Sequence, residues 1–565
     1  MMEDRKPLNA GSHVKGMETV PLLDLTVPAV LARAVANYSD NEAAVFTEEG
    51  IRWTYAEFAD AVDGLAAGLV DLGVEKGDRV GIWSPNKSAW LLTQFATARV
   101  GAILVCVNPA YRPYELEYAL NKVGCSTLIT AESFKSSNYI EMLRRLAPEL
   151  DSCAAGALVS EKLPHLKRVI AVSKQNHAGM YTFAQVQRPI AEVDRAKLDD
   201  LSAALSSEEP INIQFTSGTT GSPKGACLTH HNIVNNANAV TNTMHFTPAD
   251  RLCIPVPFYH CFGMVMGTLG CVTKGATMVV PGEAFDPETT LQAVSDEKCT
   301  ALYGVPTMFV AQLALQNFES FDLSTLRTGI MAGAPCPIEV MKSVQAKMNM
   351  SEVTIAYGMT ETSPVSFQSD VDDPLEKRVS TVGRVHPHVE CKVVGKDGQT
   401  LPVGQQGELW TRGYSVMQGS WNDADKTNGA ITEDGWMQTG DLAVIDAEGY
   451  CDITGRVKDM ILRGGENIYP REIEDFLFTH DQIAQAQVFG IPDEKFGELV
   501  CAWIVPVQDA ALTDEDVRAF CKENIAHFKV PAHIRIKDAL PMTVTGKPQK
   551  FIMRDEMVQE LDGSA

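Results

Sequence analysis

A segment rich in glycine and hydroxyl groups, residues 216–225, has the composition of a loop that binds polyphosphate. It reads TSGTTGSPKG and follows the apolar run 211–215. Glycines let backbone N–H groups turn toward an anion, while hydroxyls and a lysine add donors and charge. A helix expected from residue 230 would direct its positive end toward the same anion. The candidate ligands are Thr216, Ser217, Gly218, Thr219, Thr220, Gly221 and Lys224.

Two other interpretations of this segment are weaker. The nucleoside-triphosphate loop GxxxxGK[ST] requires glycine directly before the lysine and a hydroxyl directly after it. Here Pro223 precedes Lys224 and Gly225 follows it, so that motif is absent. A flexible linker has a similar composition, but this segment lies between two strongly patterned segments rather than between domains.

Length and composition indicate a globular chain of two or more domains. The 565 residues are 45% hydrophobic and 21% charged, with a formal net charge of −24. This charge gives no overall field for nucleic acid, so we expect no nucleic-acid partner and expect local residues to hold any anionic ligand. The 13 cysteines include no CxxC pair, which predicts reduced and mostly buried thiols.

The sequence favours a cytoplasmic location over the mitochondrial matrix. The most apolar run, 89–106, is interrupted by Gln94 and Arg99 and is interpreted as a core segment, not a transmembrane helix. The first 20 residues contain three acidic residues and no apolar stretch, a poor match to a secretory or transit peptide. We expect these 20 residues to be disordered. Peripheral membrane contact and a homodimer stay open.

Alternating helical and strand patterns predict an α/β fold with mostly parallel sheets. A capping box at Thr54 and Glu57 begins an amphipathic helix that Gly73 ends. Buried strands are expected at 77–83, 102–107, 127–130, 168–172 and 277–280, with helical patterns such as 90–99 between strands. This alternation is typical of parallel strands covered by helices.

The pattern changes near residue 380 and again after Arg456. Short strands with turns such as Asp434-Gly435 predict a β-rich subdomain. Helices at 470–479 and 513–524 and a strand at 499–505 then predict a smaller α/β unit. We therefore expect a disordered segment 1–20, a large domain 21–456 and a small mobile domain 457–565, with a hinge near Lys458.

Four further motifs occur downstream of the phosphate-binding segment in a fixed order. They are Tyr357-Gly-Met-Thr-Glu-Thr362, Thr439-Gly-Asp441, the run 456–474 and the segment 541–550. Together with residues 216–225, they resemble the adenylate-forming superfamily of acyl-CoA synthetases, firefly-type luciferases and peptide-synthetase adenylation domains. The resemblance covers roughly residues 25–550 and is strongest to medium- and long-chain fatty-acid ligases.

The resemblance implies an ATP site. Tyr357 would stack on adenine, and Thr360 would contact the α-phosphate. Glu361 would hold Mg²⁺, a hard cation that prefers carboxylate oxygen. Asp441 would accept hydrogen bonds from the two ribose hydroxyls, and Arg456 would contact ribose or phosphate. The other positions that would border the nucleotide are Gly333, Ala334, Pro335, Gly358 and Met359.

The resemblance also assigns roles to the C-terminal motifs. Lys547 would be the catalytic lysine, neutralising charge as the substrate carboxylate attacks the α-phosphorus. Lys458 occupies the hinge position, and Gly464 and Gly465 would border the tunnel for the pantetheine of coenzyme A. The family forms acyl-AMP with the lysine docked, then turns the small domain so that the thiol can enter.

The acyl site is expected around residues 255–263. His260 would lie beside the substrate carboxylate, and residues 258–263 contain no acid that could pair with the ammonium of an amino acid. Acetyl-specific relatives close the pocket with a tryptophan where this chain has Gly358, so longer acids should fit. The apolar candidates for the alkyl chain are Phe258, Phe262, Met264, Val305, Met308 and Phe309.

The predicted activity is ATP-dependent, AMP-forming ligation of a medium- or long-chain fatty acid to coenzyme A, with Mg²⁺. An adenylating enzyme that loads a carrier protein is an alternative. Aryl, short branched and sulfur-containing acids also remain open as substrates, and so does a light-emitting oxygenase. A non-catalytic nucleotide-binding relative would be expected to lack Glu361 or Lys547, and both are present.

Overall fold

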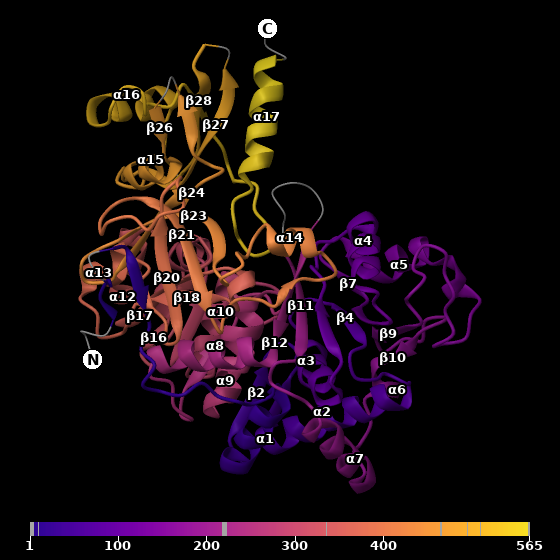
Figure 1. Ribbon diagram of the computed structural model, residues 1–565. Helices are drawn as coiled ribbons and strands as arrows, with labels where there is room; N and C mark the ends of the chain where they lie inside the picture. Colours follow the sequence, from indigo (N-terminus) through magenta and orange to yellow (C-terminus); the bar gives the residue numbers. More distant parts are fainter. Residues whose placement is uncertain are drawn as a thin grey trace.

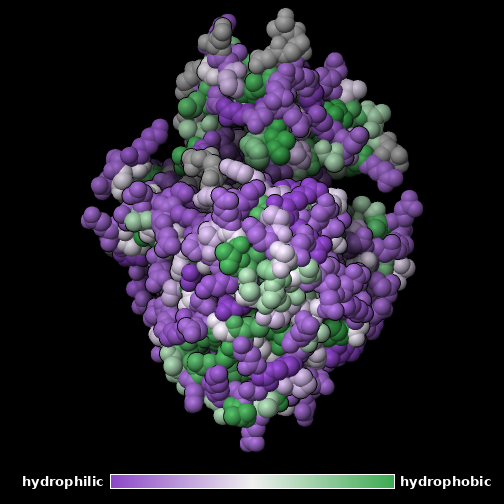
Figure 2. All heavy atoms as spheres, turned by 90° about the vertical axis from the view of Figure 1, so that its right-hand side faces the viewer, coloured by the Kyte–Doolittle hydropathy of each residue, from purple (hydrophilic) through white to green (hydrophobic). Residues whose placement is uncertain are grey.

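The computed structural model describes residues 5–8, 11–216, 223–334, 336–463, 466–493, 495–508 and 510–562. Figure 1 shows a large body formed by the N-terminal and central parts of the chain, with a smaller lobe of C-terminal elements above it. Figure 2 shows the lobe above the body from another side, with a mainly hydrophilic surface. The predicted α/β architecture is confirmed.

An eight-stranded sheet carries the phosphate-binding segment. Its order is β10-β9-β6-β4-β5-β11-β12-β22, parallel from β10 to β11 and antiparallel at β12 and β22. The strands are β4 (Arg79–Trp83), β5 (Ile103–Cys106), β6 (Thr127–Ala131), β9 (Arg168–Val172), β10 (Tyr181–Thr182), β11 (Pro210–Thr216), β12 (Lys224–Thr229) and β22 (Gly419–Ser420).

A nine-stranded sheet carries the motif around Tyr357. Its order is β19-β18-β17-β16-β15-β13-β14-β2-β3, parallel from β2 to β17 with antiparallel strands at both edges. The strands are β2 (Glu42–Phe46), β3 (Ile51–Thr54), β13 (Arg251–Cys253), β14 (Thr277–Val280), β15 (Ala301–Gly304), β16 (Thr328–Ala332), β17 (Glu352–Gly358), β18 (Val365–Gln368) and β19 (Arg384–Val385).

The largest hydrophobic core lies between these two sheets and encloses helices. It joins β4 and β5 of one sheet to β2, β13 and β15 of the other through α2 (Tyr55–Asp71), α3 (Ser88–Val100) and α8 (His230–Thr243). The capping box predicted at Thr54 begins α2. An eight-residue π-helix, η3 (Phe262–Leu269), begins within the predicted acyl motif 255–263. π-Helical turns are rare and are found frequently at functional sites.

The remaining elements of the body are mostly peripheral. They are α1 (Val27–Tyr38), α4 (Pro113–Val123), β7 (Ser133–Phe134), β8 (Ser137–Asn138), α5 (Tyr139–Leu146), η2 (Pro148–Asp151), α6 (Phe183–Val186), α7 (Glu192–Ala203), α9 (Gly270–Lys274), α10 (Pro287–Asp296), α11 (Pro306–Leu313), η4 (Phe318–Ser320), α12 (Ile338–Lys347), η5 (Thr360–Thr362), α13 (Leu375–Ser380) and α14 (Ala424–Asn428). Within the described ranges, no helix has both the length and the hydrophobicity needed to cross a membrane.

The predicted β-rich subdomain is an antiparallel five-stranded sheet. Its order is β1-β20-β21-β23-β24, formed by β1 (His13–Lys15), β20 (Val389–Val394), β21 (Gly407–Gly413), β23 (Met437–Ile445) and β24 (Cys451–Arg456). Strand β1 corrects the expectation that the first 20 residues are disordered. Val14 is fully buried opposite Cys391, so the segment is held by long-range pairing that its own composition does not reveal.

The C-terminal lobe has its own sheet and its own hydrophobic clusters, drawn from residues 461–557. The strands are β25 (Ile461–Arg463), β26 (Glu466–Ile468), β27 (Ile483–Asp493), β28 (Gly497–Pro506) and β29 (His533–Ile536), and the helices are α15 (Pro470–Leu477), α16 (Asp514–Asn524) and α17 (Lys550–Asp562). The helices and strand predicted here from the sequence are therefore confirmed.

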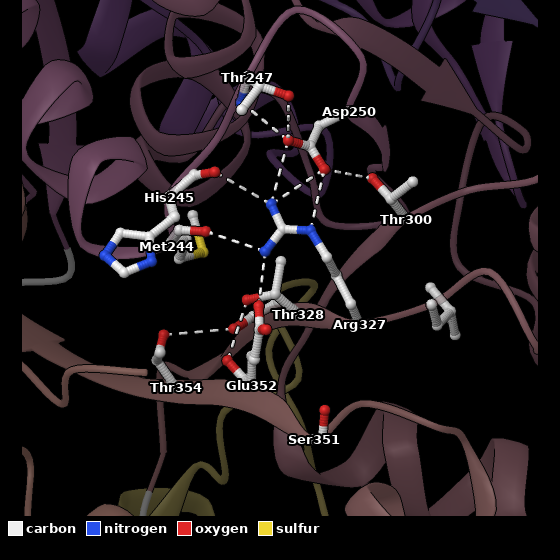
Figure 3. Close-up of polar contacts among 12 residues, drawn as sticks. Met244, His245, Thr247, Asp250, Thr300, Arg327, Thr328, Ser351, Glu352 and Thr354 are labelled. Carbon is white, nitrogen blue, oxygen red and sulfur yellow. Dashed lines mark hydrogen bonds and ion pairs between the residues drawn. The ribbon is translucent and has the colours of Figure 1, made fainter. Parts of the chain in front are cut away.

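Polar groups fix the amino-terminal ends of β15–β17, at the edge opposite to the predicted site. Arg327, directly before β16, contacts both carboxylate oxygens of Asp250 at 3.0 Å and lies 2.6 Å from Glu352 (Figure 3). Asp250 also accepts hydrogen bonds from Thr247 and from Thr300. This network ties together the starts of β13, β15, β16 and β17 and leaves their carboxyl ends for the site.

Candidate active site

The predicted phosphate-binding segment lies between two antiparallel strands. Thr216, the last residue of β11, pairs with Lys224, the first residue of β12. Helix α8 begins at His230, at the far end of β12 and roughly 17 Å along the strand from Lys224. The expectation that this helix directs its positive end at the bound anion is therefore wrong, because a strand intervenes. The predicted ligands Ser217, Gly218, Thr219, Thr220 and Gly221 lie outside the described residues.

Glu361 and Thr216 meet at the carboxyl ends of their sheets. The Thr216 hydroxyl lies 3.2 Å from Oε1 of Glu361, although 145 residues separate them. The Glu361 carbonyl accepts a 2.8 Å hydrogen bond from the N–H of Met417. Thr360 is buried and lies beside Cys261. The structure thus places hydroxyl and carboxylate oxygens from two motifs together.

The predicted adenine and ribose residues are also in contact. The Tyr357 hydroxyl donates a 2.6 Å hydrogen bond to Oδ2 of Asp441, and Nε of Arg456 lies 3.0 Å from Oδ1 of the same carboxylate. Asp441 and Arg456 are paired across β23 and β24, and the Thr439 hydroxyl accepts from the Asp441 N–H. Asp441 is 6% exposed. The buried carboxylate is therefore held by two side chains from different strands, and Thr439 holds the backbone N–H of Asp441.

Lys547 is carried to this region by a hairpin of the C-terminal lobe. The N–H of Thr543 donates to the Lys547 carbonyl at 2.8 Å, and the Lys547 N–H donates to the Thr543 hydroxyl at 3.0 Å. Gly546 has a φ of +76°, and a β-carbon there would lie 2.8 Å from Cγ2 of Val305, so glycine permits both the turn and the approach to α11.

The charge of Lys547 is only partly compensated. A β-carbon built at Gly333 would lie 3.7 Å from Cε of Lys547, which places the lysine beside the end of β16. Burial, followed by the positive charge of Arg456, lowers the pKa of the Lys547 ammonium, while Asp441 and Glu361 act in the opposite direction. An anion bound among these groups would stabilise the ammonium.

His260 is a neutral imidazole with a defined tautomer. Burial, followed by the charge of Lys547, lowers the pKa of His260 to about 3. Its Nδ1 accepts a 3.2 Å hydrogen bond from the N–H of Phe262, so the ring proton must be on Nε2. Asn86 fixes the segment before it, accepting from the N–H of Phe258 and donating to the carbonyl of Val256. His260 is thereby prepared to donate a hydrogen bond.

A cavity of about 290 Å³ lies at the junction of body and lobe. Its walls include Tyr259, Phe285 and Met308, and residues Thr543 and Val544 of the Lys547 hairpin close it from the lobe. Val305, another predicted acyl residue, lies between the positions of Gly333 and Gly546. The hairpin therefore covers a cavity with both polar and apolar walls, next to the predicted acyl residues.

Two of the predicted acyl residues pack elsewhere. Phe258 is fully buried against Phe46 and Trp90, and Phe309 belongs to the core on the other face of the nine-stranded sheet. Met308 and Phe309 are neighbours on α11, where successive side chains point in different directions around the helix axis, so Met308 lines the cavity while Phe309 packs into that core. Phe262 packs against Tyr303 with 5.3 Å between ring centroids and the rings tilted by 31°. Met264 is buried within η3 in the same core as Phe262.

Gly358 is explained by local backbone packing. A β-carbon at this position would lie 1.8 Å from the carbonyl oxygen of Pro364, closer than any contact real structures allow. Glycine is therefore required by the bulge between β17 and β18 and does not by itself report pocket depth. Met359 and Ala334 flank the same region, whereas Pro335, Gly464 and Gly465 lie outside the described residues.

Comparison of the sequence with protein-family models identifies the family of this chain. Residues 31–421 match the model described as AMP-binding enzyme, and residues 472–547 match the one described as AMP-binding enzyme C-terminal domain. The chain belongs to the AMP-binding enzyme family.

Relatives of this AMP-binding enzyme extend over nearly all of the chain. The putative acyl-CoA synthetase YngI of Bacillus subtilis (strain 168) is 47% identical over 539 residues, 95% of this chain and 98% of that protein. The mitochondrial medium-chain acyl-CoA ligase ACSF2 of Danio rerio is 45% identical over 558 residues, 98% of this chain and 92% of that protein. The crystal structure of ATP-bound MatB from Rhodopseudomonas palustris has a TM-score of 0.78 at 27% identity, covering 94% and 99% of the two chains.

Sequence analysis missed the asparagines of α8 in this AMP-binding enzyme. The buried Asn236 side chain holds the N–H and carbonyl of Val365 at 3.0 and 2.8 Å, directly after the Glu361 motif. Asn232 donates to the carbonyls of Tyr414 and Val416. Asn235 holds the N–H and carbonyl of Leu23. The signal in the sequence was the run of asparagines in a helix that also carries apolar residues, because buried side-chain amides require hydrogen-bond partners.

Proposed function

We propose that this AMP-binding enzyme ligates a medium-chain carboxylic acid to coenzyme A, with ATP cleaved to AMP and pyrophosphate through an acyl-adenylate. The observation that carries the proposal is the approach of Lys547, from the C-terminal lobe, to the region of Asp441, Arg456 and His260. The names of the relatives, acyl-CoA synthetase and medium-chain acyl-CoA ligase, support the reaction and the chain length.

In the first half-reaction, a carboxylate oxygen of the acid attacks the α-phosphorus of ATP and pyrophosphate leaves. Lys547 supplies positive charge where these two anions converge, which stabilises the transition state more than the separate substrates. The Nε2–H of His260 donates to the carboxylate and orients it. Asp441 accepts from the ribose hydroxyls, with Arg456 beside it, and the ring of Tyr357 supports the adenine.

The donors around Glu361 fit Mg²⁺. The Glu361 carboxylate lies beside the hydroxyl of Thr216, and such hard oxygen donors suit a cation that binds phosphates with one or two carboxylates. Bound there by Glu361, Mg²⁺ would supply further positive charge for the phosphates. The Thr216 hydroxyl orients the carboxylate, and Lys224 and the other residues of the segment 216–225 bind the polyphosphate.

In the second half-reaction, the small domain 457–565 turns relative to the large domain 21–456 about Lys458. The hairpin that closes the cavity supports this step, because Thr543 and Val544 stand where a thiol would have to approach. Separate hydrophobic clusters for residues 461–557 are consistent with a unit that moves as a body. Gly464 and Gly465 would then border the entering pantetheine, whose thiolate attacks the acyl carbonyl and releases AMP.

Apolar side chains favour an alkyl acid over a charged one. Phe262, Val305 and Met308 lie close to the lysine hairpin or to the core beside His260, and each methylene buried against them contributes about 0.8 kcal/mol. Residues 258–263 contain no carboxylate, so an ammonium group would lack a partner there. An amino acid is therefore a poor substrate.

The test is AMP release with ATP, Mg²⁺ and coenzyme A across linear acids from acetate to palmitate, together with benzoate. Maximal turnover from hexanoate to dodecanoate, dependent on coenzyme A, is the expected result. Release that requires a phosphopantetheinyl carrier protein and ignores coenzyme A would overturn the proposal. A maximum with benzoate would change the proposed substrate from an alkyl to an aryl acid and would leave the proposed reaction unchanged.

One sequence-based prediction and two open questions accompany this proposal. The sequence favours action in the cytoplasm, and it leaves peripheral membrane contact and a homodimer open. Cell fractionation, vesicle sedimentation and light scattering of the purified protein test them in turn.

A further inference from the structure

The hairpin that carries Lys547 has a closed stem at its base. The N–H of Gln549 donates to the carbonyl of Pro541 at 2.9 Å, and Met542 forms a β-bridge with Pro548. Helix α17 begins at Lys550, three residues after Lys547. Because the stem is short and closed, a shift of Lys550 must displace Lys547.

A buried carboxylate on another helix fixes Lys550. Its Nζ lies 2.7 Å from Oε1 of Glu474 on α15, and the same oxygen accepts a 2.8 Å hydrogen bond from the N–H of Val488. Glu474 is 4% exposed. A carboxylate this buried is costly unless it is paired and hydrogen-bonded, so the pair constrains both helices to one arrangement.

The pair also joins two functionally different parts of the lobe. Helix α15 follows β26 and lies close in sequence to the predicted hinge at Lys458, whereas Lys550 ends the Lys547 hairpin. Both α15 and α17 pack against β27. The ion pair therefore connects the hinge side of the lobe to the segment that must enter the active site.

We infer that Glu474 and Lys550 are positioning residues for Lys547 and act on adenylation rather than on thioester formation. The inference rests on the function proposed above. In the docked arrangement Lys547 must reach the region of Gly333 and Arg456 with little error, because small misplacements of a catalytic group are costly. Lys547 is withdrawn during thiol attack, so the same loosening has little effect on that step.

The experiment separates the two half-reactions in Glu474→Gln and Lys550→Met. ATP–pyrophosphate exchange with the preferred acid measures adenylation, and thioester yield from supplied acyl-AMP and coenzyme A measures the second step. Exchange should fall about tenfold, which corresponds to an activation barrier raised by about 1.4 kcal/mol. Thioester formation should change less than about twofold. Lys550→Arg keeps the charge and should restore most of the exchange.

A matched control lies on the same helix. Glu472 pairs with Lys529, but its side chain is 54% exposed. Glu472→Gln should therefore leave both half-reactions unchanged. Glutamine keeps the shape of Glu474 and its bond from Val488, and melting curves of all variants report whether the lobe stays folded.

The outcomes distinguish the two proposals. Equal loss of both half-reactions, or the same loss in Glu472→Gln, would overturn the positioning role while leaving the proposed function intact. A wild-type enzyme without pyrophosphate exchange for any acid would instead remove the proposed function and, with it, this inference.

Discussion

The hydroxyl of Tyr357 donates to Oδ2 of Asp441 at 2.6 Å, which joins motifs 84 residues apart. Arg456 contacts the other oxygen of the same carboxylate at 3.0 Å. Asp441 is therefore oriented from both sides before any nucleotide binds. Preorganisation of this kind reduces the conformational entropy lost on nucleotide binding, because the Asp441 side chain is already held in one orientation.

Asp441→Asn should raise the KM for ATP by roughly tenfold to a hundredfold, because hydrogen bonds to a charged group contribute about 1.5–3 kcal/mol each. Tyr357→Phe keeps the ring and removes only the donor to Asp441, so its KM should rise less than about tenfold. Initial rates of AMP release at varied ATP measure both. An unchanged KM in Asp441→Asn would place the ribose elsewhere.

Lys547→Ala should reduce pyrophosphate exchange by roughly two to three decades, since one lost donor to developing charge costs about 3–4 kcal/mol. Thioester formation from supplied acyl-AMP should remain largely intact. Lys522→Ala, at an exposed lysine on α16 of the same lobe, is the control and should behave as wild type. Equal loss of both half-reactions in a folded Lys547→Ala protein would contradict alternation of the lobe.

Motif chemistry predicted which residues belong to the site better than how they are arranged. Tyr357, Asp441 and Arg456 were assigned by resemblance, and the structure brings them into contact. The prediction that α8 directly approaches the phosphate-binding segment was wrong, because the mixed pattern of β12 does not identify it as a strand from the sequence. Pairing with β11 and β22 stabilises it, and such pairing is a tertiary property.

The limits of sequence reasoning have the same physical origin elsewhere. Phe258 and Phe262 have equal hydrophobicity, yet one packs on Trp90 and the other on Tyr303, a difference set by backbone direction. The N-terminal strand β1 has no strong pattern of its own and is ordered by β20. The role of Asn236 follows from its hydrogen bonds to the backbone of Val365, a long-range contact that the sequence does not reveal.

Acid should weaken the fold through buried neutral histidines such as His386. Burial, followed by the charge of Arg5, lowers its pKa to about 3, against 6.5 in the unfolded chain. Below pH 6.5 the unfolded state binds the proton and the folded state does not, so stability falls as pH falls, by about 1.4 kcal/mol per pH unit for one histidine. Above pH 7 the residue contributes no pH dependence.

His386→Gln tests this contribution. Above about pH 7, the urea unfolding midpoints of wild type and variant should differ by a constant amount. As pH falls from 6.5 toward 4.5, the wild-type midpoint should fall relative to that of the variant and change the gap between them, because only the wild type carries this proton uptake. A constant gap over that range would mean that His386 is charged in the folded protein or does not titrate on unfolding.

Asp250→Ala should destabilise the body without altering the chemistry. Asp250 is 4% exposed and accepts from Arg327, Thr247 and Thr300, so its loss leaves the half-buried Arg327 guanidinium without this carboxylate, at a cost of about 2 kcal/mol. The network shown in Figure 3 lies at the amino-terminal ends of β13 and β15–β17. The site is at the carboxyl ends of these strands, so turnover per folded molecule should not change. Lys298→Ala, which removes an exposed ion pair to Asp322, should shift stability by less than about 1 kcal/mol. Urea unfolding together with AMP release at a temperature where both variants are folded measures the two effects. A large loss of turnover in folded Asp250→Ala would show that the strand starts are coupled to the site.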